Sequence, residues 1–388
     1  MDSIFSAQGP SLGYLYQIRY GLFLLVSSQN PDSKLFIEKM DDISIETPSS
    51  MNYYQTKYHV NSVANLTDSS PDLWKTIRVW SEQLLSGQID INNSFFNLIT
   101  TATTSQNTIP YLLKNGSSGS RDIELIQSRL KGVTLDSKNL SNSSAYDAFS
   151  NLDDEQQKTL ISKISVLDGA LELDDIKNQI KKFLIYSTAP ERIESLFERL
   201  EGWFLGKVFM QLQNKMAEIS GKDVQAKILD IADCLKSDNL PADFPSSIAS
   251  DEDLLSPYRG QQFVRQLEII GINHKLINHA ISDYHRAFSQ KSKWLREGLI
   301  IPQDDMEYDK KIVDDWERKF ATLDDCSGRD DLAKKTEGKL FYENYYVITC
   351  PDIHFKDRFK ERYMITGSCQ ILSDKKKVGW HPDYKDII

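Results

Sequence analysis

Apolar residues near the start of the chain alternate between a helical period and a strand period. Residues 11–28 carry apolar side chains three and four positions apart, and this spacing predicts a helix. Two strands are predicted next: residues 34–46 are rich in apolar and β-branched side chains, and residues 51–59, M-N-Y-Y-Q-T-K-Y-H, follow as the second strand. A Pro- and Ser-containing turn signal separates them, and a helix at residues 71–86 and a buried strand at 94–102 follow.

The helical period dominates the middle of the chain. Five helices are predicted there, at residues 121–131, 153–165, 172–184, 190–217 and 222–237. Residues 239–257 contain three prolines together with several Asp and Ser residues, a composition typical of a linker. Another helix is predicted at 260–297, with a break near Gly271, and strand-like runs return over residues 339–372.

These patterns predict two domains. We expect residues 1–235 to form an α/β domain with a helical extension, and residues 236–256 to form a linker. We expect residues 257–388 to form a mainly helical domain that ends in a few strands. A chain of 388 residues is long enough for two domains.

Composition narrows the class of protein. Hydrophobic residues make up 40% and charged residues 26% of the chain, as in globular proteins. No apolar run is long enough to span a bilayer and the first residues do not resemble a secretion signal, so we expect a cytoplasmic protein with no membrane partner. The four cysteines form no CxxC pair and are expected to be free thiols. A net charge of −10 argues against coating nucleic acid by charge alone, although a local basic groove could still hold phosphates.

The strand–turn–strand segment at residues 35–58 holds the most informative polar side chains. Because side chains alternate along a strand, Gln55 and Lys57 point the same way, and Glu38 and Asp42 share a face if the first strand is continuous. The hairpin can bring Asp42 close to Gln55 and Lys57. Carboxylate and amide oxygens suit Mg²⁺, and a neighbouring lysine can orient water or stabilise charge on a phosphate. This set suits phosphodiester hydrolysis, although the same residue types are common on exposed strand faces.

Four sequence elements of the N-terminal half carry a family resemblance. They are G-Y-L-Y-Q at 13–17, F-I-E-K-M-D-D-I at 36–43, Y-Q-T-K at 54–57 and F-F-N-L-I-T-T-A at 95–102. In this order they resemble the double-stranded-DNA endonuclease domain of bacterial CD-NTase-associated effectors, which belongs to the restriction-endonuclease-like, PD-(D/E)xK superfamily.

The resemblance implies roles for five residues. Asp42, Gln55 and Lys57 match the D…(E/Q)xK signature by position. Glu38 matches the acidic residue upstream, and Gln17 matches the polar residue on the first helix. The implied cofactor is Mg²⁺ or Mn²⁺, held by Asp42 with Glu38 or Gln55, while Lys57 assists the attacking water. Gln55 departs from the commonest form of the signature, which has an acid there, and an amide is the weaker metal ligand.

The C-terminal third carries a second resemblance. Its motifs are F-V-R-Q-L-E-I-I-G-I at 263–272, A-I-S-D-Y-H-R-A-F at 280–288, W-L-R-E at 294–297, D-D-W-E-R-K-F at 314–320 and V-G-W-H-P-D-Y at 378–384. They are similar to the C-terminal domain of effectors in ABC-three-component, or Lamassu, defence systems.

Together the two resemblances imply a nuclease effector that cuts double-stranded DNA of phages or plasmids. The implied partners are an SMC-like, Rad50-related ATPase and a small middle subunit, with release or homo-oligomerisation of the nuclease switching it on. The alternative is a non-catalytic adaptor that binds DNA or a partner in the same kind of complex. The chain has no G-x-x-x-x-G-K-[ST] loop, so we do not expect it to hydrolyse ATP itself.

Overall fold

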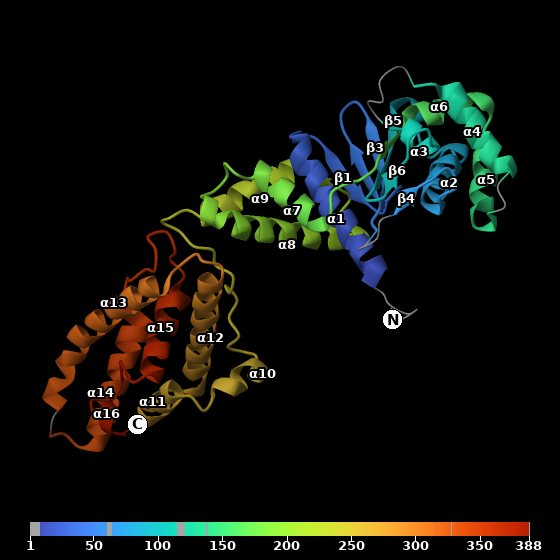
Figure 1. Cartoon of the computed structure of the whole chain (residues 1–388). Coiled ribbons are helices and arrows are strands. Elements are labelled where there is room, and N and C mark those ends of the chain that lie inside the picture. The colour runs from blue at the N-terminus through green and yellow to red at the C-terminus, as the bar shows by residue number, and fades with distance from the viewer. Residues whose placement is uncertain (1–7, 60–63, 115–120, 137–138, 327, 388) are drawn as a thin grey trace. The chain divides into compact units, whose positions relative to one another are not determined.

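The computed structural model divides the chain into two compact units (Figure 1). It describes residues 8–59, 64–114, 121–136, 139–326 and 328–387. The first unit comprises Met1–Ala189 and Leu196–Asp230, and the second comprises Pro190–Ser195 and Ile231–Ile388. The segment 236–256, which the sequence predicts as a linker, packs within the second unit. There Asp243 accepts a hydrogen bond from Gln290, and the Pro241 carbonyl accepts one from Trp294.

The first unit is built on a mixed six-stranded sheet with the strand order β7-β5-β3-β2-β1-β8. β3, β5 and β7 run parallel, and β2, β1 and β8 continue the sheet by antiparallel pairing. A separate two-stranded sheet pairs β4 with β6. The strands are β1 Lys34–Ile37, β2 Ile43–Glu46, β3 Met51–Lys57, β4 Asn65–Leu66, β5 Ser94–Thr100, β6 Thr103–Thr104, β7 Ile164–Leu167 and β8 Ile219–Ser220.

Helices surround this sheet, and most of those that the sequence predicts are confirmed. The helices up to the unit boundary are α1 Gln8–Ser28, α2 Pro71–Leu85, α3 Ile109–Leu112, α4 Ile123–Asp136, α5 Ser143–Ser150, α6 Asp154–Lys163, α7 Leu173–Phe183, α8 Ile193–Leu212 and α9 Gly221–Cys234, with the 3-10 turns η1 Ile91–Asn93, η2 Leu140–Asn142 and η3 Pro190–Arg192. The sequence patterns missed β7 and α5. β7 follows α6 without a break, so its first two residues, Ile164 and Ser165, were included in the predicted helix at 153–165.

The predicted single strand at residues 34–46 is wrong, because the chain reverses in its middle. Ile37 of β1 pairs with Ile43 of β2, and the Glu38 amide donates to the Asp42 carbonyl at 3.1 Å to close the turn. Glu38 has a φ of 55°, in the left-handed region. The reversal lets the apolar residues of both halves face the core, which one continuous strand with a polar K-M-D-D centre could not do.

The core lies on both faces of the sheet. One face places Tyr53, Phe96 and Leu98 against α2, whose Trp74 and Trp80 are fully buried. The other face packs on α1. There a Cβ added at Gly21 would lie 3.2 Å from Leu35 Cδ1 and 3.3 Å from Ile37 Cδ1, so glycine allows close approach of helix and strand. Burial of each large apolar side chain contributes roughly 1.5–3 kcal/mol, and both faces therefore fix the positions of β1 and β3.

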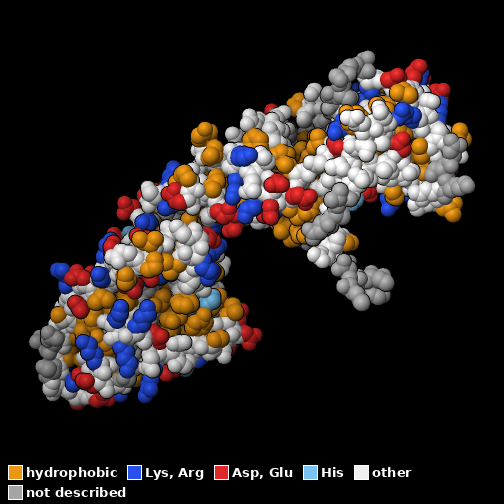
Figure 2. All heavy atoms as spheres, viewed as in Figure 1, with side chains coloured by type: hydrophobic (Ala, Val, Ile, Leu, Met, Phe, Trp, Pro, Cys, Tyr) orange, Lys and Arg blue, Asp and Glu red, His pale blue; other side chains and the backbone are white. Residues whose placement is uncertain are grey.

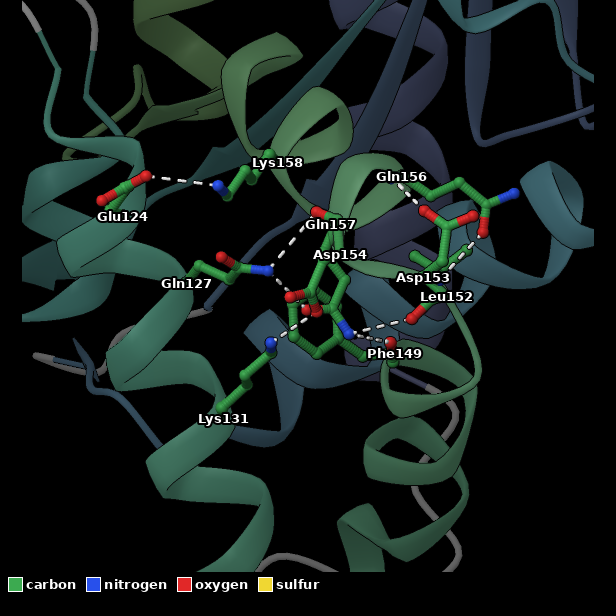
Figure 3. Close-up of polar contacts among 10 residues, drawn as sticks. All are labelled: Glu124, Gln127, Lys131, Phe149, Leu152, Asp153, Asp154, Gln156, Gln157 and Lys158. Atoms are coloured by element: carbon green, nitrogen blue, oxygen red, sulfur yellow. Dashed lines mark hydrogen bonds and ion pairs between the residues drawn. The ribbon is translucent and has the colours of Figure 1, made fainter.

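Helices α4, α5 and α6 form a layer joined by buried amide contacts (Figure 3). Gln157 of α6 donates to the carbonyls of Phe149 and Leu152, both at 3.1 Å, and accepts from Gln127 of α4 at 2.9 Å. Asp153 starts α6 with a reciprocal capping box to Gln156. These contacts satisfy polar groups at the helix ends.

In the second unit the regular elements among the described residues are helices, and residues 236–251 and 350–361 connect them without a named strand. Its helices are α10 Glu252–Leu255, α11 Gln262–Ile269, α12 His274–Arg296, α13 Pro302–Phe320, α14 Asp331–Tyr342, α15 Arg362–Asp374 and α16 Tyr384–Ile387, with the 3-10 turns η4 Ser256–Tyr258 and η5 Ala321–Cys326 and the π-helical segment η6 Glu343–Thr349. The predicted break near Gly271 is confirmed, since this residue separates α11 from α12 with a φ of 73°. All four cysteines are free thiols, as predicted. In the part of the chain that the structure describes, every helix is too short or too polar to cross a membrane.

The predicted C-terminal strands at residues 339–372 are wrong. Aromatic side chains in the first half recur four residues apart, so Phe341 stacks on Tyr345 and Tyr342 stacks on Tyr346 along one helix face. In the second half, residues 363–373 are all buried within α15. Its polar residues Thr366, Ser368, Gln370 and Ser373 are as buried as its apolar ones, so the segment has no amphipathic period, and enrichment in aromatic and β-branched residues elsewhere in 339–372 favoured strand incorrectly.

Packing of α15 against α12 depends on Gly367. A Cβ at this position would lie 2.1 Å from the Asp283 carbonyl oxygen and 2.6 Å from the Ala287 Cβ. We expect Gly367→Ala to destabilise the second unit by about 1–3 kcal/mol in urea unfolding of the full chain, because the helices must move apart.

The matched control is Gly206→Ala in α8, where an added Cβ would meet nothing within 4 Å. It should leave stability unchanged or raise it by up to about 1 kcal/mol, because alanine is the better helix former. Equal unfolding midpoints for the two variants would contradict the close packing of α12 and α15.

Candidate functional site

The turn between β1 and β2 is fixed to helix α1 by Gln17. This side chain is 4% exposed, and its Nε2 donates to Glu38 Oε1 at 3.0 Å and to the Asp42 carbonyl oxygen at 2.5 Å. Glu38 is exposed at the tip of the turn. The buried Gln17 amide thus bonds both ends of the turn, at Glu38 and at Asp42, and fixes the turn to α1.

The Asp42 carboxylate accepts hydrogen bonds from Gln55 and Thr56, near the end of β3. Its Oδ2 accepts from the Thr56 amide at 2.8 Å and from the Thr56 hydroxyl at 2.9 Å, and its Oδ1 accepts from Gln55 Nε2 at 3.2 Å. These donors fix the carboxylate without burying it fully. One lone pair of Oδ1 therefore remains directed away from its protein partner.

Gln55 and Lys57 lie on the same face of β3, as strand alternation requires. Lys57 Nζ donates to Gln55 Oε1 at 3.0 Å, and the Gln55 amide nitrogen faces Asp41 and Asp42. The amide is 7% exposed and links the lysine to the aspartates. The structure thus brings Gln17, Glu38, Asp42, Gln55 and Lys57 into one connected group.

Asp41 also belongs to this group, and the sequence analysis missed it. Its Oδ2 accepts from the Trp80 indole nitrogen at 2.6 Å, and its Oδ1 accepts from Gln55 and from the Asp42 amide. Burial raises the pKa of Asp41 to about 7, against the hydrogen bonds from Trp80 and Gln55, which lower it. In the predicted continuous strand Asp41 and Asp42 would point to opposite faces, so strand alternation excluded Asp41 from the site. The one sequence signal for Asp41 was its position next to Asp42.

Tyr14 is a second residue that the sequence analysis missed. It lies one helical turn before Gln17, and its buried hydroxyl makes no hydrogen bond among the described residues. Burial, and to a smaller degree the negative charge of Glu38, raises the pKa of Tyr14. The site therefore contains a hydroxyl that can still donate a hydrogen bond.

The oxygen donors of this group suit Mg²⁺. The described residues contain no group of three or more His, Cys, Asp or Glu side chains that could hold a metal ion by themselves. Mg²⁺ commonly takes only one or two carboxylates and fills its other positions with water and substrate phosphate. Asp42 Oδ1 keeps one lone pair beside its bond from Gln55, and Glu38 accepts a bond through Oε1 alone, whereas both Asp41 oxygens are engaged by buried donors. The residues present thus fit a site that substrate completes.

Stability should depend on pH through Asp41. Its folded pKa of about 7 lies above the ordinary value of 3.8, so between these values the unfolded chain is ionised while the folded chain keeps its proton. Stability is then lost as pH rises through this window. Relative to Asp41→Asn, the wild-type chain should lose about 1.4 kcal/mol of unfolding free energy per pH unit from about pH 4 to 7.

Urea unfolding of both proteins, followed by tryptophan fluorescence at several pH values, measures this difference. Subtraction removes the titration of all other groups. A constant difference across the window would show that Asp41 titrates alike in the folded and unfolded chains.

Gln55→Glu tests whether this group holds a metal ion. Without metal, the new carboxylate faces Asp41 and Asp42 in place of an amide donor, and we expect a loss of about 1–3 kcal/mol. Mg²⁺ or Mn²⁺ should restore more stability to this variant than to wild type, because a cation offsets the added charge.

Thermal unfolding in EDTA and in each metal measures this effect. Gln156→Glu is the control, since Gln156 only accepts from the Asp153 amide through its Oε1 and glutamate preserves that acceptor. The same instability of Gln55→Glu with and without metal would count against a cation at these residues.

Comparison with known proteins finds one family. Residues 263–388 match the family described as C-terminal domain 7 of the ABC-three component (ABC-3C) systems. No curated protein matches the chain.

Solved structures give only distant likenesses. A Cap4 SAVED/CARF-domain containing receptor of Moraxella osloensis matches with 14% identity and a TM-score of 0.37, covering 72% of this chain and 68% of that chain. The receptor of the same description from Acinetobacter baumannii matches with 12% identity and a TM-score of 0.33, covering 74% and 61%. At these TM-scores the likeness does not establish a shared fold. The family match stands by itself: the chain carries the C-terminal domain 7 of ABC-three-component systems, which supports its membership of a defence system of that kind.

Proposed function

We propose that the chain is a metal-dependent double-stranded DNA endonuclease, the effector subunit of an ABC-three-component complex of the Lamassu type. The observation that supports this function is the hydrogen-bonded group of Gln17, Glu38, Asp42, Gln55 and Lys57 at one end of the sheet. Its residue types and order are those of the restriction-endonuclease-like signature, on a mixed sheet flanked by helices.

In this proposal Asp42 is the principal metal ligand. The Thr56 amide and hydroxyl hold its carboxylate through Oδ2, and Oδ1 accepts from Gln55 and keeps one lone pair, so the ligand is oriented before any ion binds. Glu38 supplies a second carboxylate from the exposed turn, and Gln17 positions it. When bound, Mg²⁺ or Mn²⁺ would lower the pKa of a water molecule and neutralise charge on the phosphate.

Lys57 acts on the attacking water or on the phosphate. Its Nζ is bonded to Gln55 Oε1 at 3.0 Å, which leaves two of the three ammonium protons free to donate. In the present orientation Gln55 places both Asp42 and Lys57, through its two amide atoms, and so acts as a positioning residue.

An adaptor without catalytic activity is the second candidate. Hydrogen bonds within the protein already engage both oxygens of Asp42, and Gln55 turns its nitrogen rather than its oxygen toward that carboxylate. Such an adaptor would bind DNA without metal and release no products.

The partners follow from the C-terminal domain. For a chain of this family we propose assembly with an SMC-like, Rad50-related ATPase and a small middle subunit in the cytoplasm, and homo-oligomerisation when the nuclease is activated. The second unit is the part of the chain assigned to docking, because the family match lies entirely within it.

Lys57→Ala is the direct test of catalysis. Removal of one charge-stabilising donor should lower the rate of duplex cleavage in Mg²⁺ by about 100- to 1,000-fold. Lys57 lies at the end of β3 and half-exposed, so the fold should survive, as circular dichroism can verify. The substrates are linear and circular duplex DNA, each with Mg²⁺ or with EDTA.

Lys75→Ala provides the control, since this exposed lysine of α2 lies outside the site. Cleavage by wild type and Lys75→Ala but not by Lys57→Ala supports the proposal. Equal cleavage by all three proteins overturns the site. Metal-independent binding of duplex with no product, also after the ATPase and the middle subunit are added, identifies the adaptor.

A further inference from the structure

A groove of about 690 Å³ opens directly beside Glu38 in the first unit. One wall is the end of β1 with the start of its turn, residues 36–39, and the other is the connection between α8 and β8, residues 211–217. Glu38 belongs both to this wall and to the candidate catalytic group, so the groove continues away from that group.

Hydrogen bonds fix the second wall. Gln211 Nε2 donates to the Leu35 carbonyl at 2.9 Å and to the Ala217 carbonyl at 3.3 Å, which ties the end of α8 to β1. The helix ends with Asn214 at a φ of 56°, and the Lys215 amide closes the last turn on the Met210 carbonyl at 2.8 Å. These hydrogen bonds fix the position of the second wall relative to β1.

The groove presents positive charge that the protein does not neutralise. Lys39 and Lys215 are exposed on opposite walls, and within the described residues neither forms an ion pair. Glu38 is the one acid of the lining, at the catalytic end. Lys39 lies with its Nζ 4.2 Å from the centroid of the Phe36 ring, which holds its ammonium group over the wall.

This local charge stands out because the chain as a whole is acidic. The net charge is −10, and acidic as well as basic side chains are spread over the face seen in Figure 2. Long-range attraction of nucleic acid is therefore weak, and binding must depend on local contacts. The negative end of the α8 dipole accounts for a lysine at position 215, but it does not account for Lys39 on the opposite wall.

We propose that this groove binds the sugar-phosphate backbone of duplex DNA next to the phosphate at the candidate site, with Lys39 and Lys215 each contacting a phosphate. The inference rests on the proposed endonuclease function and adds the residues that hold its substrate. The one aromatic ring of the lining, Phe36, is only 5% exposed, so the groove offers no ring on which an unpaired base could stack. Contacts to phosphates alone carry no sequence information, and binding should be tolerant of sequence.

The experiment measures binding of a short blunt-ended duplex, and of its single strands, to the full chain in EDTA at several salt concentrations. EDTA keeps the probe intact and separates binding from cutting. The variant is Lys39→Ala/Lys215→Ala, with both single variants beside it. The control is Lys75→Ala/Lys182→Ala, which removes the same charge from exposed lysines of α2 and α7 outside the groove.

The groove variant should bind duplex more weakly than wild type, and the slope of log affinity against log salt should fall by about 2, one for each lost phosphate contact. Each single variant should reduce the slope by about 1, and the control by much less. Cleavage in Mg²⁺ at saturating DNA should be retained by the groove variant, with a raised KM.

Several results would overturn the proposal: equal affinity of the groove variant and wild type, equal losses in the groove and control variants, no duplex binding by wild type, or tighter binding of single strands than of duplex. A wild type that binds duplex through the two lysines but never cuts it would instead reject the endonuclease function and keep the groove. A groove variant that binds and cuts duplex as wild type does would reject the groove and keep the endonuclease function.

Discussion

The candidate site depends on the contact between the Asp42 carboxylate and the end of β3. Two donors of Thr56 and the amide of Gln55 hold Asp42, which ties the β1–β2 turn to the strand that carries Lys57. Hydrogen bonds to an ionised carboxylate are worth about 1.5–3 kcal/mol, more than those between neutral groups. Without this contact the turn would still be held by Gln17 of α1 and by Trp80 and Gln83 of α2, but the Asp42 carboxylate would lose its direct link to the strand that carries Lys57.

The same turn introduces a buried carboxyl group into the core. Asp41 lies against Trp80, between the sheet and α2, where desolvation raises its pKa to about 7. A buried carboxyl is tolerated because three donors converge on it, and these include the Gln55 amide. Gln55 therefore serves the core and the site at once. This double role gives a physical reason for an amide at a position where related signatures have an acid, since a third carboxylate there would repel two others in the absence of metal.

The two units divide the proposed work. The first contains the polar group, the sheet that positions it and the groove lined by Lys39 and Lys215. The second contains the family domain at residues 263–388, packed around the close approach of α12 and α15 at Gly367. A helical unit with a tightly packed core suits a docking role, because a rigid interior keeps the surface residues that would meet a partner in fixed positions.

Local pattern determined the elements whose period was unambiguous. The helical spacing over residues 11–28, the strand alternation that aligns Gln55 with Lys57, and the break at Gly271 all follow from short-range geometry. Four of the five candidate residues were found for the same reason, since they lie within the short segment 38–57 and resemble a known signature, and Gln17 of α1 was found from that resemblance. Only the tertiary structure decided that the chain reverses at Glu38, because a polar K-M-D-D segment is compatible with either a strand or a turn until both apolar halves must face one core. Packing likewise made residues 339–349 and 362–372 helical. The second of these segments is buried on every side, so it has no exposed face from which a period can be read, and contacts with distant elements settle its conformation.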